Sequence, residues 1–547
     1  MIGADLVAQT LKAHGVTFLS ALVGNGINPV LHSARQAGLR VIDTRNEQTA
    51  SYMAEVYGRF TGRVGVCGVS ASVGHTNALT GLLNARFDGA PVLLISGSAE
   101  HALSDRGKFQ DFDQVATAAA ICKYARLVDR PEKIPFYLHE ALAHATSGRP
   151  GPVHLTIPQD ILEAEVSGFP AASLGSTDCG IVQPNCLGNP RLVEEAAAAI
   201  AGAERPLLIA GSGVYYAHGE EVLARFAALT QMPVMVPIWD RGSVPNRIPQ
   251  FIGVIGAASG SSDLLAEADL ILLAGARVDY RLGYLQPPAV RPDARVIRID
   301  VDPLELRQGI DPHIALQGDP RSVLEQLSAQ LSGAAAPAHA LWLEEAHRRD
   351  RAFRERWRPG AYQANGKATG WHVVEALRPF VQGDTVLVTD GGNIGQWMHM
   401  ALCDRYPGDW MTCGASGVVG YGLGGAMAAR LAYPDRPVIL LSGDGSIGFN
   451  LADLESATRH RLPFVIVVAD DQAWGITASN QLEQYGREEM VGCSLGPIRF
   501  DLAAQALGAH GVRVEDPREI GPAIERGLSA DRPTLIHVPI AHGGPAD

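Results

Sequence analysis

The chain has 547 residues and a net charge of −13 at pH 7. This length is too great for one core and predicts about three domains, while the acidic balance without a basic stripe argues against nucleic acid as a partner. No run of about twenty apolar residues predicts a membrane span, and the N-terminus lacks the basic and apolar segments of a secretory signal. Seven cysteines without a Cys-x-x-Cys pair favour reduced thiols, so we expect a cytoplasmic protein.

In the N-terminal part of the chain, an acidic residue follows a predicted strand. The strand is predicted around Val41 and Ile42, and Glu47 stands after it at the start of a helical pattern that reaches Arg59. A glutamate in the first turn of a helix commonly does no more than complement the helix dipole. A chemical role for Glu47 therefore needs support from the rest of the sequence.

Stretches rich in Gly, Ser, Pro and Asn divide the chain into three parts. Residues 165–190 hold no clear apolar period, and a second break lies near residues 332–338, as is typical of linkers. Between these breaks, predicted strands over 206–210, 270–274 and 295–300 alternate with helical patterns. We therefore predict an α/β protein with three doubly wound parallel-sheet domains, over residues 1–165, 190–332 and 360–547.

The C-terminal part contains a strand, a tight turn, a helix and a second strand. An apolar run over 437–442 leads into the turn Gly443-Asp444-Gly445-Ser446-Ile447-Gly448, the predicted helix covers 451–457 with Asn450 as a candidate N-cap, and the next strand covers 464–470. Glycines at such a turn let the backbone approach phosphate oxygens, and a helix N-terminus offers free N–H groups. This unit predicts a diphosphate-binding site.

Three interpretations of this unit are open. The glycines of residues 443–448 match G-x-G-x-x-G, and Asp470 lies at a suitable distance to hold a ribose hydroxyl, which predicts a nicotinamide-dependent oxidoreductase. Alternatively, Asp444 and Asp471 hold Mg²⁺ together with a backbone carbonyl. A third interpretation is an ordinary turn with solvated acids. The same glycine pattern recurs within residues 420–425, so the pattern discriminates weakly.

Taken together, segments along the whole chain resemble the thiamine diphosphate carboligase and decarboxylase superfamily. The segments are 41–59, 70–77, 84–93, 148–153 and the unit at 443–471. The resemblance implies a pyrimidine-binding N-terminal domain, a central domain and a diphosphate-binding C-terminal domain, with thiamine diphosphate and Mg²⁺ as cofactors. Because active sites of this family lie between subunits, it also implies at least a homodimer, and a homotetramer is expected.

The resemblance assigns roles to individual residues. It implies that Glu47 hydrogen-bonds the pyrimidine ring of the cofactor and activates it, and that Asp444, Asp471 and the carbonyl of Ala473 hold Mg²⁺. Val419, in the glycine-flanked loop 414–422, takes the position of the aliphatic wedge that bends the cofactor. The remaining cofactor-binding residues implied are Gly24, Gly74, Asn77, Gly392, Asn393, Gly417, Gly443, Gly445, Ser446, Trp474, Gly475 and Ile476. Gln110 and Asn25 are candidates for proton handling, although Gln110 has an equal alternative as an amide that orders its loop.

The sequence departs from the family pattern at two places. The family normally has Asn at the position of Asp471, and the loop 22–27 lacks a histidine that many decarboxylases carry there. We expect the additional charge of Asp471 beside a diphosphate to make cofactor affinity more dependent on the cation.

Different segments resemble different branches of the superfamily. Val23-Gly24 and residues 109–114 are similar to oxalyl-CoA decarboxylase and 2-hydroxyacyl-CoA lyase, whereas residues 443–449 and 472–475 are more similar to benzaldehyde lyase and acetolactate synthase. We predict a carbon–carbon bond lyase or carboligase acting on small carbonyl substrates, 2-keto acids or 2-hydroxy ketones. A CoA-dependent lyase or decarboxylase, a nicotinamide oxidoreductase and a non-catalytic binding protein are the alternatives.

The central domain has glycines after two predicted strands, in the segments 210–214 and 274–279. In acetolactate synthases the equivalent domain holds FAD, and in oxalyl-CoA decarboxylase it holds ADP. Most relatives leave this domain empty, and a glycine after a strand is a routine turn. Both interpretations stay open.

Overall fold

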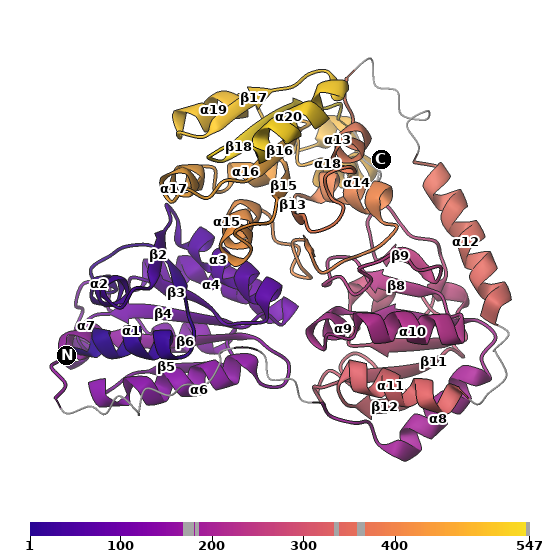
Figure 1. The fold of residues 1–547 in the computed structure, drawn as a ribbon, viewed down its shortest axis with the longest axis horizontal. Coiled ribbons are helices and arrows are strands. Elements are labelled where there is room, and N and C mark those ends of the chain that lie inside the picture. Colours follow the sequence, from indigo (N-terminus) through magenta and orange to yellow (C-terminus); the bar gives the residue numbers. More distant parts are fainter. Residues whose placement is uncertain (168–179, 181–184, 333–338, 358–366, 543–547) are drawn as a thin grey trace.

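The computed structural model describes residues 1–167, 180, 185–332, 339–357 and 367–542. Within them, three six-stranded sheets follow one another along the chain, and every pairing of their strands is parallel (Figure 1). Helices pack against each sheet, which confirms the predicted α/β class with three parallel-sheet domains. The predicted linkers at 165–190 and 332–338 lie mainly outside the described residues.

The N-terminal sheet has the order β2-β1-β3-β4-β6-β5, so the strand order reverses between β1 and β3. Its strands are β1 (Phe18–Ala21), β2 (Arg40–Asp43), β3 (Gly65–Val69), β4 (Val92–Ser98), β5 (Tyr124–Leu127) and β6 (Pro152–Pro158). Its helices are α1 (Gly3–Ala13), α2 (Asn28–Gln36), α3 (Glu47–Thr61), α4 (Val73–Asp88), α5 (Gln114–Ala119), α6 (Ile134–Thr146) and α7 (Gln159–Glu163). Helix α3 begins at Glu47, as predicted, and the side chain of Asn46 caps it by accepting the N–H of Gln48.

The central sheet has the order β12-β11-β10-β7-β8-β9, in which the order reverses between β7 and β10. Its strands are β7 (Pro206–Ala210), β8 (Val234–Pro237), β9 (Phe251–Ile255), β10 (Leu270–Ala274), β11 (Arg295–Asp300) and β12 (Ile314–Gln317). Its helices are α8 (Pro190–Ala201), α9 (Ser212–Tyr216), α10 (Glu220–Thr230), α11 (Pro320–Leu331) and α12 (His339–Glu355). The three strands that were predicted here coincide with β7, β10 and β11. Strands β7 and β10 are short apolar runs that are buried on both faces, whereas β11 has a buried centre and more exposed, charged ends.

The C-terminal sheet repeats the order of the N-terminal one, as β14-β13-β15-β16-β18-β17, with the reversal between β13 and β15. Its strands are β13 (Val386–Asp390), β14 (Trp410–Met411), β15 (Val438–Gly443), β16 (Val465–Asp470), β17 (His510–Arg513) and β18 (Thr534–Pro539). Its helices are α13 (Gly370–Leu377), α14 (Gly392–Leu402), α15 (Gly422–Ala432), α16 (Asp444–Gly448), α17 (Asp453–Arg459), α18 (Gly475–Tyr485), α19 (Phe500–Ala506) and α20 (Ile520–Leu528).

One expectation about this domain is wrong. The helix after the glycine turn begins at Asp453 with Ala452 as its N-cap, and a separate short helix, α16, begins directly at Asp444. Asn450 is not a helix cap, because its Nδ2 donates a hydrogen bond to the Gly420 carbonyl, 2.9 Å away. A tertiary contact has taken the place of the predicted local one.

The N-terminal and C-terminal domains share one hydrophobic core. Tyr52 and Val56 of α3 belong to the same buried cluster as Tyr421 and Met427 at and within α15. The rings of Tyr52 and Tyr421 meet edge to face with their centroids 6.5 Å apart. Figure 1 shows α3 and α15 side by side where these two domains meet. The start of α3 is therefore held in a fixed relation to the C-terminal domain.

Candidate active site

A cavity of about 180 Å³ lies at the switch point of the C-terminal sheet. The strands β13, β15 and β16 end at it, which is the position where open parallel sheets commonly bind ligands. Its lining consists of Gly391, Gly392, Asn393, Ile394, Val419, Gly443, Asp444, Gly445, Ser446, Ala469, Asp471, Ala473, Trp474, Gly475, Ile476, Thr477 and Ile540. The structure thus brings together most of the residues that were predicted around the diphosphate.

Two helices of eleven residues point their N-termini into this cavity. The first residues of α14 and of α18 line it, and within the described chain neither helix has a side chain that caps its first N–H groups. Uncapped N–H groups and the positive end of the helix dipole favour an anion. This end of the cavity is therefore suited to phosphate oxygens.

The carboxyl groups of Asp444 and Asp471 occupy the same cavity. Burial first, and then the charges of Asp471 and Asp470, raise the pKa of Asp444 to about 8. Burial also raises the pKa of Asp471, whose Oδ2 accepts a hydrogen bond from Asn393 Nδ2 at 3.3 Å and lies 3.6 Å from Nδ1 of His542. A buried carboxyl pair in which Asp471 disfavours the ionisation of Asp444 forms an oxygen donor set that a hard cation would stabilise.

The described residues contain no group of three or more His, Cys, Asp or Glu side chains that could hold a metal ion. A cation at Asp444 and Asp471 would therefore need other oxygens, which the Ala473 carbonyl and phosphate groups can supply. The residues present fit a metal-held diphosphate, because anion-binding helix ends and cation-binding carboxyls face one cavity.

A loop of the C-terminal domain carries Val419 to the edge of the cavity. Asp390, at the end of β13, accepts the N–H of Gly420 at 3.1 Å and that of Gly422 at 2.7 Å, and burial raises the pKa of this carboxyl to about 6. Asn450 holds the Gly420 carbonyl from the other side. Gly417 has a φ of +68° and is exposed, and it is not among the described lining residues.

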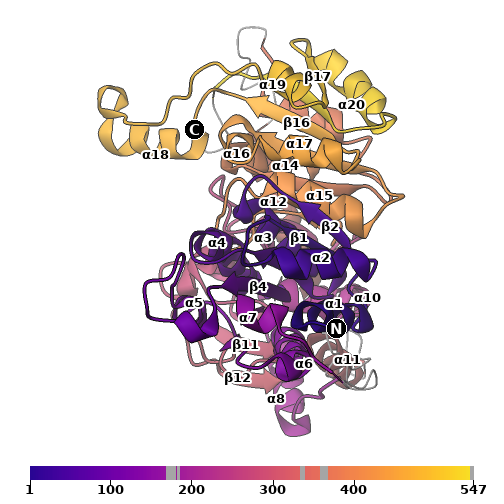
Figure 2. The same ribbon diagram turned by 90° about the vertical axis from the view of Figure 1, so that its left-hand side faces the viewer.

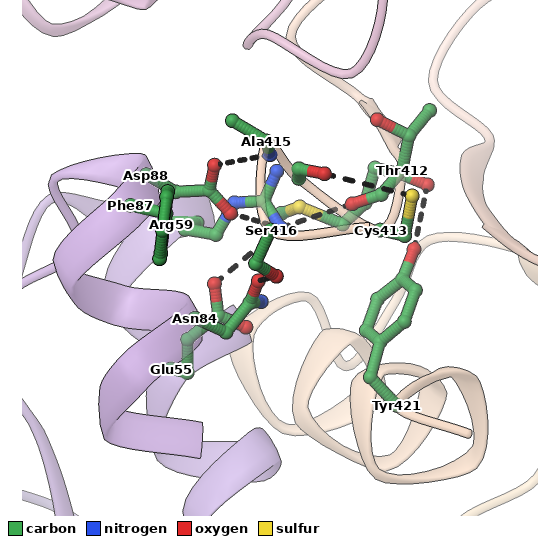
Figure 3. Close-up of polar contacts among 12 residues, drawn as sticks. Glu55, Arg59, Asn84, Phe87, Asp88, Thr412, Cys413, Ala415, Ser416 and Tyr421 are labelled. Atoms are coloured by element: carbon green, nitrogen blue, oxygen red, sulfur yellow. Dashed lines mark hydrogen bonds and ion pairs between the residues drawn. The ribbon is translucent and has the colours of Figure 1, made fainter. Parts of the chain in front are cut away.

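The beginning of the same loop is tied to the N-terminal domain, as Figure 3 shows. Arg59 Nη1 donates to the Thr412 carbonyl at 2.9 Å, and Asp88 Oδ1 accepts the N–H of Ala415 at 2.9 Å. Ser416 Oγ donates to Asn84 Oδ1 at 2.5 Å. Helices α3 and α4 of the N-terminal domain thereby hold residues 412–416 of the loop in place.

Glu47 and the other residues predicted in the N-terminal domain form a separate group. Asn77 Nδ2 donates to Glu47 Oε2 at 3.0 Å, and a Cβ atom on Gly74 would stand 3.2 Å from Glu47 Oε1, close enough to press on the carboxyl group. Gly24 packs against Ser70, where an added Cβ would clash at 2.6 Å. None of the described residues that line the cavity comes from the N-terminal domain. Within one chain, the group of residues around Glu47 and the cavity of the C-terminal domain are therefore separate.

The two residues predicted to handle protons lie in loops of the N-terminal domain. Asn25 is exposed after β1, and Gln110 has a φ of +61° in the loop after β4, a conformation that is uncommon outside glycine. Neither is among the described lining residues of the cavity. Their proposed roles stay predictions.

The interpretation of Asp470 as a ribose ligand is not supported by its surroundings. Asp470 is buried, its Oδ2 pairs with His537 Nε2 at 2.8 Å, and its Oδ1 accepts the N–H of Gln472. A carboxylate with both oxygens engaged inside the domain is not free to bind a sugar hydroxyl.

Sequence reasoning missed the organising role of Asp390 and the contribution of Ile540. Asp390 was assigned no role from the sequence, although an acid followed by two glycines at a strand end is a recognisable signal for a carboxylate that holds a loop backbone. Ile540 follows the last strand, and nothing local distinguishes it from a core residue.

A cavity of about 80 Å³ lies at the switch point of the central sheet, where residues 87–89 and 148–150 of the N-terminal domain line it as well. The glycines of its turns are explained by close packing, since a Cβ on Gly213 would stand 2.7 Å from the Cα of Gly275. The first N–H groups of α9 are also occupied, that of Ser212 by Asp240 and that of Gly213 by the Gly275 carbonyl. These contacts favour the interpretation as turns, and a nucleotide in this domain stays a prediction.

The described residues contain no helix that is both long and apolar enough to cross a membrane. Every described cysteine carries a free thiol.

Three parallel sheets, with a cavity at the switch point of the last one that two helix N-termini and a buried carboxyl pair line, define a doubly wound α/β protein. Family models for the thiamine pyrophosphate enzymes match all three domains: the N-terminal TPP binding domain over residues 1–117, the central domain over 193–327 and the C-terminal TPP binding domain over 390–538. The chain belongs to the thiamine pyrophosphate enzyme family, which confirms the suspected superfamily and its cofactor, thiamine diphosphate.

Individual relatives cover almost the whole chain. Acetolactate synthase isozyme 2 large subunit of Escherichia coli is 32% identical over 99% of this chain and 96% of its own. 2-Hydroxyacyl-CoA lyase 2 of Bos taurus is 31% identical over 94% of this chain and 86% of its own. The probable acetolactate synthase large subunit of Methanocaldococcus jannaschii is 28% identical over 99% of this chain and 92% of its own. The chain is thus similar both to acetolactate synthases and to a 2-hydroxyacyl-CoA lyase.

Proposed function

We propose that this thiamine diphosphate enzyme makes or breaks a carbon–carbon bond next to a carbonyl group, with 2-keto acids or 2-hydroxy ketones as substrates. The observation that carries the proposal is the convergence of two uncapped helix N-termini and the Asp444–Asp471 pair on one cavity. When bound, thiamine diphosphate supplies a carbon nucleophile at its thiazolium ring. The chain's task is to bind and orient this group and to exclude water from it.

In this proposal, the diphosphate is held by the first turns of α14 and α18 and by the backbone of Gly443, Gly445 and Ser446. Mg²⁺ is held by Asp444, Asp471 and the carbonyl of Ala473, together with phosphate oxygens. The ring of Trp474 packs over Gly445, where an added Cβ would stand 2.6 Å from it. Val419 and Ile476 supply the apolar walls beside the cofactor.

The proposal assigns Glu47 to the cavity of a second copy, so that the active unit is at least a homodimer. Large apolar side chains are exposed on both halves of the site: Val23, Val73, Phe109 and Phe112 in the N-terminal domain, and Phe449, Leu482 and Tyr485 in the C-terminal domain. Figure 2 shows α18 extending away from the body of its domain, and only Ala478 of this helix is buried. Such surfaces support a further protein contact. The homotetramer and the cytoplasmic location stay predictions.

Mixed dimers test this arrangement. Co-expression of Glu47→Gln and Asp444→Asn chains with different tags gives a heterodimer whose two defects fall in one site if Glu47 serves its partner's cavity. The second site is then intact, and about half of the wild-type activity per dimer is expected. If Glu47 served the cavity of its own chain, each site would carry one defect and the heterodimer would be as inactive as the two parent variants. Thermal melting of the Glu47→Gln and Asp444→Asn homodimers serves as the control for folding.

A 2-hydroxyacyl-CoA lyase is the second candidate, and one observation favours it. A cavity of about 280 Å³ between the N-terminal and central domains is lined by Arg86, Lys123, Arg149 and Arg277, which suits the phosphates of a CoA thioester. Asp302 and Glu305 line it as well and weaken its positive character. Turnover of a panel of 2-keto acids, 2-hydroxy ketones and 2-hydroxyacyl-CoA thioesters distinguishes the candidates, since cleavage confined to thioesters would replace the first with the second.

A further inference from the structure

The chain segment on either side of Glu47 is bound by an aspartate from the C-terminal domain. Asp453, the first residue of α17, is fully buried, and its Oδ1 accepts the N–H of Arg45 at 2.6 Å. Its Oδ2 accepts the hydroxyl of Thr49 at 2.5 Å. One carboxylate therefore bonds the chain two residues before Glu47 and two residues after it.

This arrangement fixes the direction in which α3 begins. Asn46 caps the helix from within the segment by accepting the N–H of Gln48, so the cap alone sets the helix end but not its position against another domain. The Asp453 carboxylate adds two charge-assisted hydrogen bonds in a site from which water is excluded, and such bonds are stronger and more directional than neutral ones. The backbone that carries Glu47 is thereby tied to α17.

A second contact between α17 and this segment lies two residues before Arg45. Arg459, at the end of α17, donates to both oxygens of Asp43 at 2.7 and 2.9 Å, and His460 Nε2 lies 2.8 Å from Asp43 Oδ1. These groups are partly exposed and contribute less than the buried contact. Residues of helix α17 thus bind the segment 43–49 near both ends of that segment.

The same part of the C-terminal domain also reaches the cavity. Helix α16, which begins with Asp444, precedes α17 by four residues, and Asn450 between them holds the Gly420 carbonyl beside Val419. Residues 444–459 therefore contact the cavity, the loop of Val419 and the segment of Glu47.

We propose that Asp453 is a positioning residue for Glu47, acting through the Arg45 backbone and the Thr49 hydroxyl to set where the glutamate points. The inference rests on the proposed role of Glu47 in the reaction. Asp453 contacts neither substrate nor cofactor, and its effect is transmitted by the first turn of α3.

Hydrogen exchange of the cofactor-free protein tests the contact without reference to catalysis. Asp453→Ala is expected to accelerate amide exchange in residues 44–52 about tenfold or more, while amides of β4 keep their protection. Asp453→Asn, which retains an acceptor oxygen for the Arg45 N–H, should give an intermediate effect. Glu455→Gln is the matched control, because this residue lies on the same helix and reaches the segment through partly exposed ion pairs, with the Arg45 side chain at 3.6 Å and with Arg459, which holds Asp43. Unchanged exchange of residues 44–52 in Asp453→Ala would overturn the inference.

A double-mutant cycle tests the consequence for the reaction. Asp453→Ala should lower kcat roughly 10- to 100-fold in the wild-type background but cause no further loss in Glu47→Gln. In that variant the carboxyl group that Asp453 positions has already been removed. Equal losses in both backgrounds would show that Asp453 only stabilises the domain contact, and would refute the positioning role. If Asp453→Ala does not fold, Thr49→Val removes one donor of the same contact and enters the cycle in its place.

The proposed roles of Glu47 and of Asp453 can be refuted separately. If Glu47→Gln leaves kcat unchanged, the proposed role of Glu47 is lost. If Glu47→Gln lowers kcat and Asp453→Ala does not, only the inference about Asp453 is lost.

Discussion

Arg59 Nη1 lies 3.4 Å from Asp88 Oδ2, and both side chains are buried where the N-terminal domain meets the loop 412–416 (Figure 3). The same nitrogen lies 3.4 Å from Glu55 Oε1, so one guanidinium faces two carboxyls. The cluster of Glu55, Arg59 and Asp88 holds the loop that leads to Val419. A change in its charge is therefore expected to alter both the stability of the domain contact and the shape of the candidate site.

Replacement of Arg59 by methionine should destabilise the protein strongly. Arg59→Met leaves Glu55 and Asp88 buried without this cation, a change that typically costs about 3–5 kcal/mol. Urea denaturation followed by tryptophan fluorescence measures the effect. Arg225→Met is the matched control, since the partner of Arg225 is the exposed Glu221 at 3.9 Å, and its midpoint should not move. Similar midpoints for the two variants would contradict the prediction.

Glu55 should make the protein less stable as the pH rises. Burial raises the pKa of Glu55 to about 7 from an ordinary 4.5, so its contribution to stability is fully present below pH 4.5 and is lost as the pH rises through 7. Glu55→Gln cannot ionise, so its melting temperature relative to wild type should increase between pH 4.5 and 7.5, by an amount equivalent to roughly 2–3 kcal/mol. Parallel melting curves across this range would contradict the prediction, and Glu221→Gln at the exposed site serves as the control.

Asp471 should make cofactor binding depend on Mg²⁺ and on protons. At pH 7 the Asp444 carboxyl, with its pKa near 8, is largely protonated, so cation binding should release close to one proton. In Asp471→Asn one of the opposing charges is absent, the pKa of Asp444 falls, and both the proton release and the Mg²⁺ dependence of the thiamine diphosphate Kd should decrease. Calorimetric titrations in two buffers of different ionisation enthalpy, at several Mg²⁺ concentrations, measure both quantities. Affinity that responds to Mg²⁺ as in wild type would refute this role of Asp471.

The two ends of α16 should respond differently to an added methyl group. Gly445→Ala would place a Cβ 2.6 Å from the Trp474 ring, whereas a Cβ on Gly448 meets no heavy atom within 4 Å. We expect Gly445→Ala to weaken thiamine diphosphate binding at least tenfold by displacing Trp474, and Gly448→Ala to bind normally. Equal affinities of the two variants would show that Trp474 moves aside without affecting the site.

Much of the fold could be predicted because its signals are local. The strands at 206–210 and 270–274 are short apolar runs between turn residues, the strand at 295–300 has apolar residues at 296, 297 and 299, and the structure places strands at all three. The acids at 444 and 471 could be paired in advance, because each stands at or just after the carboxyl end of a strand and neighbouring parallel strands end at the same edge of a sheet. The roles assigned to these residues stay predictions until they are tested in solution.

The tertiary structure alone decided which distant groups meet. Asn450 was predicted to cap a helix but instead bonds the carbonyl of Gly420. Asp453 binds Thr49, which lies 404 positions away along the chain. Sequence placed Glu47 at the start of a helix, but only the packing of α3 against the C-terminal domain shows that it stands apart from its own chain's cavity. The physical reason is the range of the interactions: propensity and periodicity act over a few residues, whereas the partner of a buried polar group is chosen by the packing of whole domains.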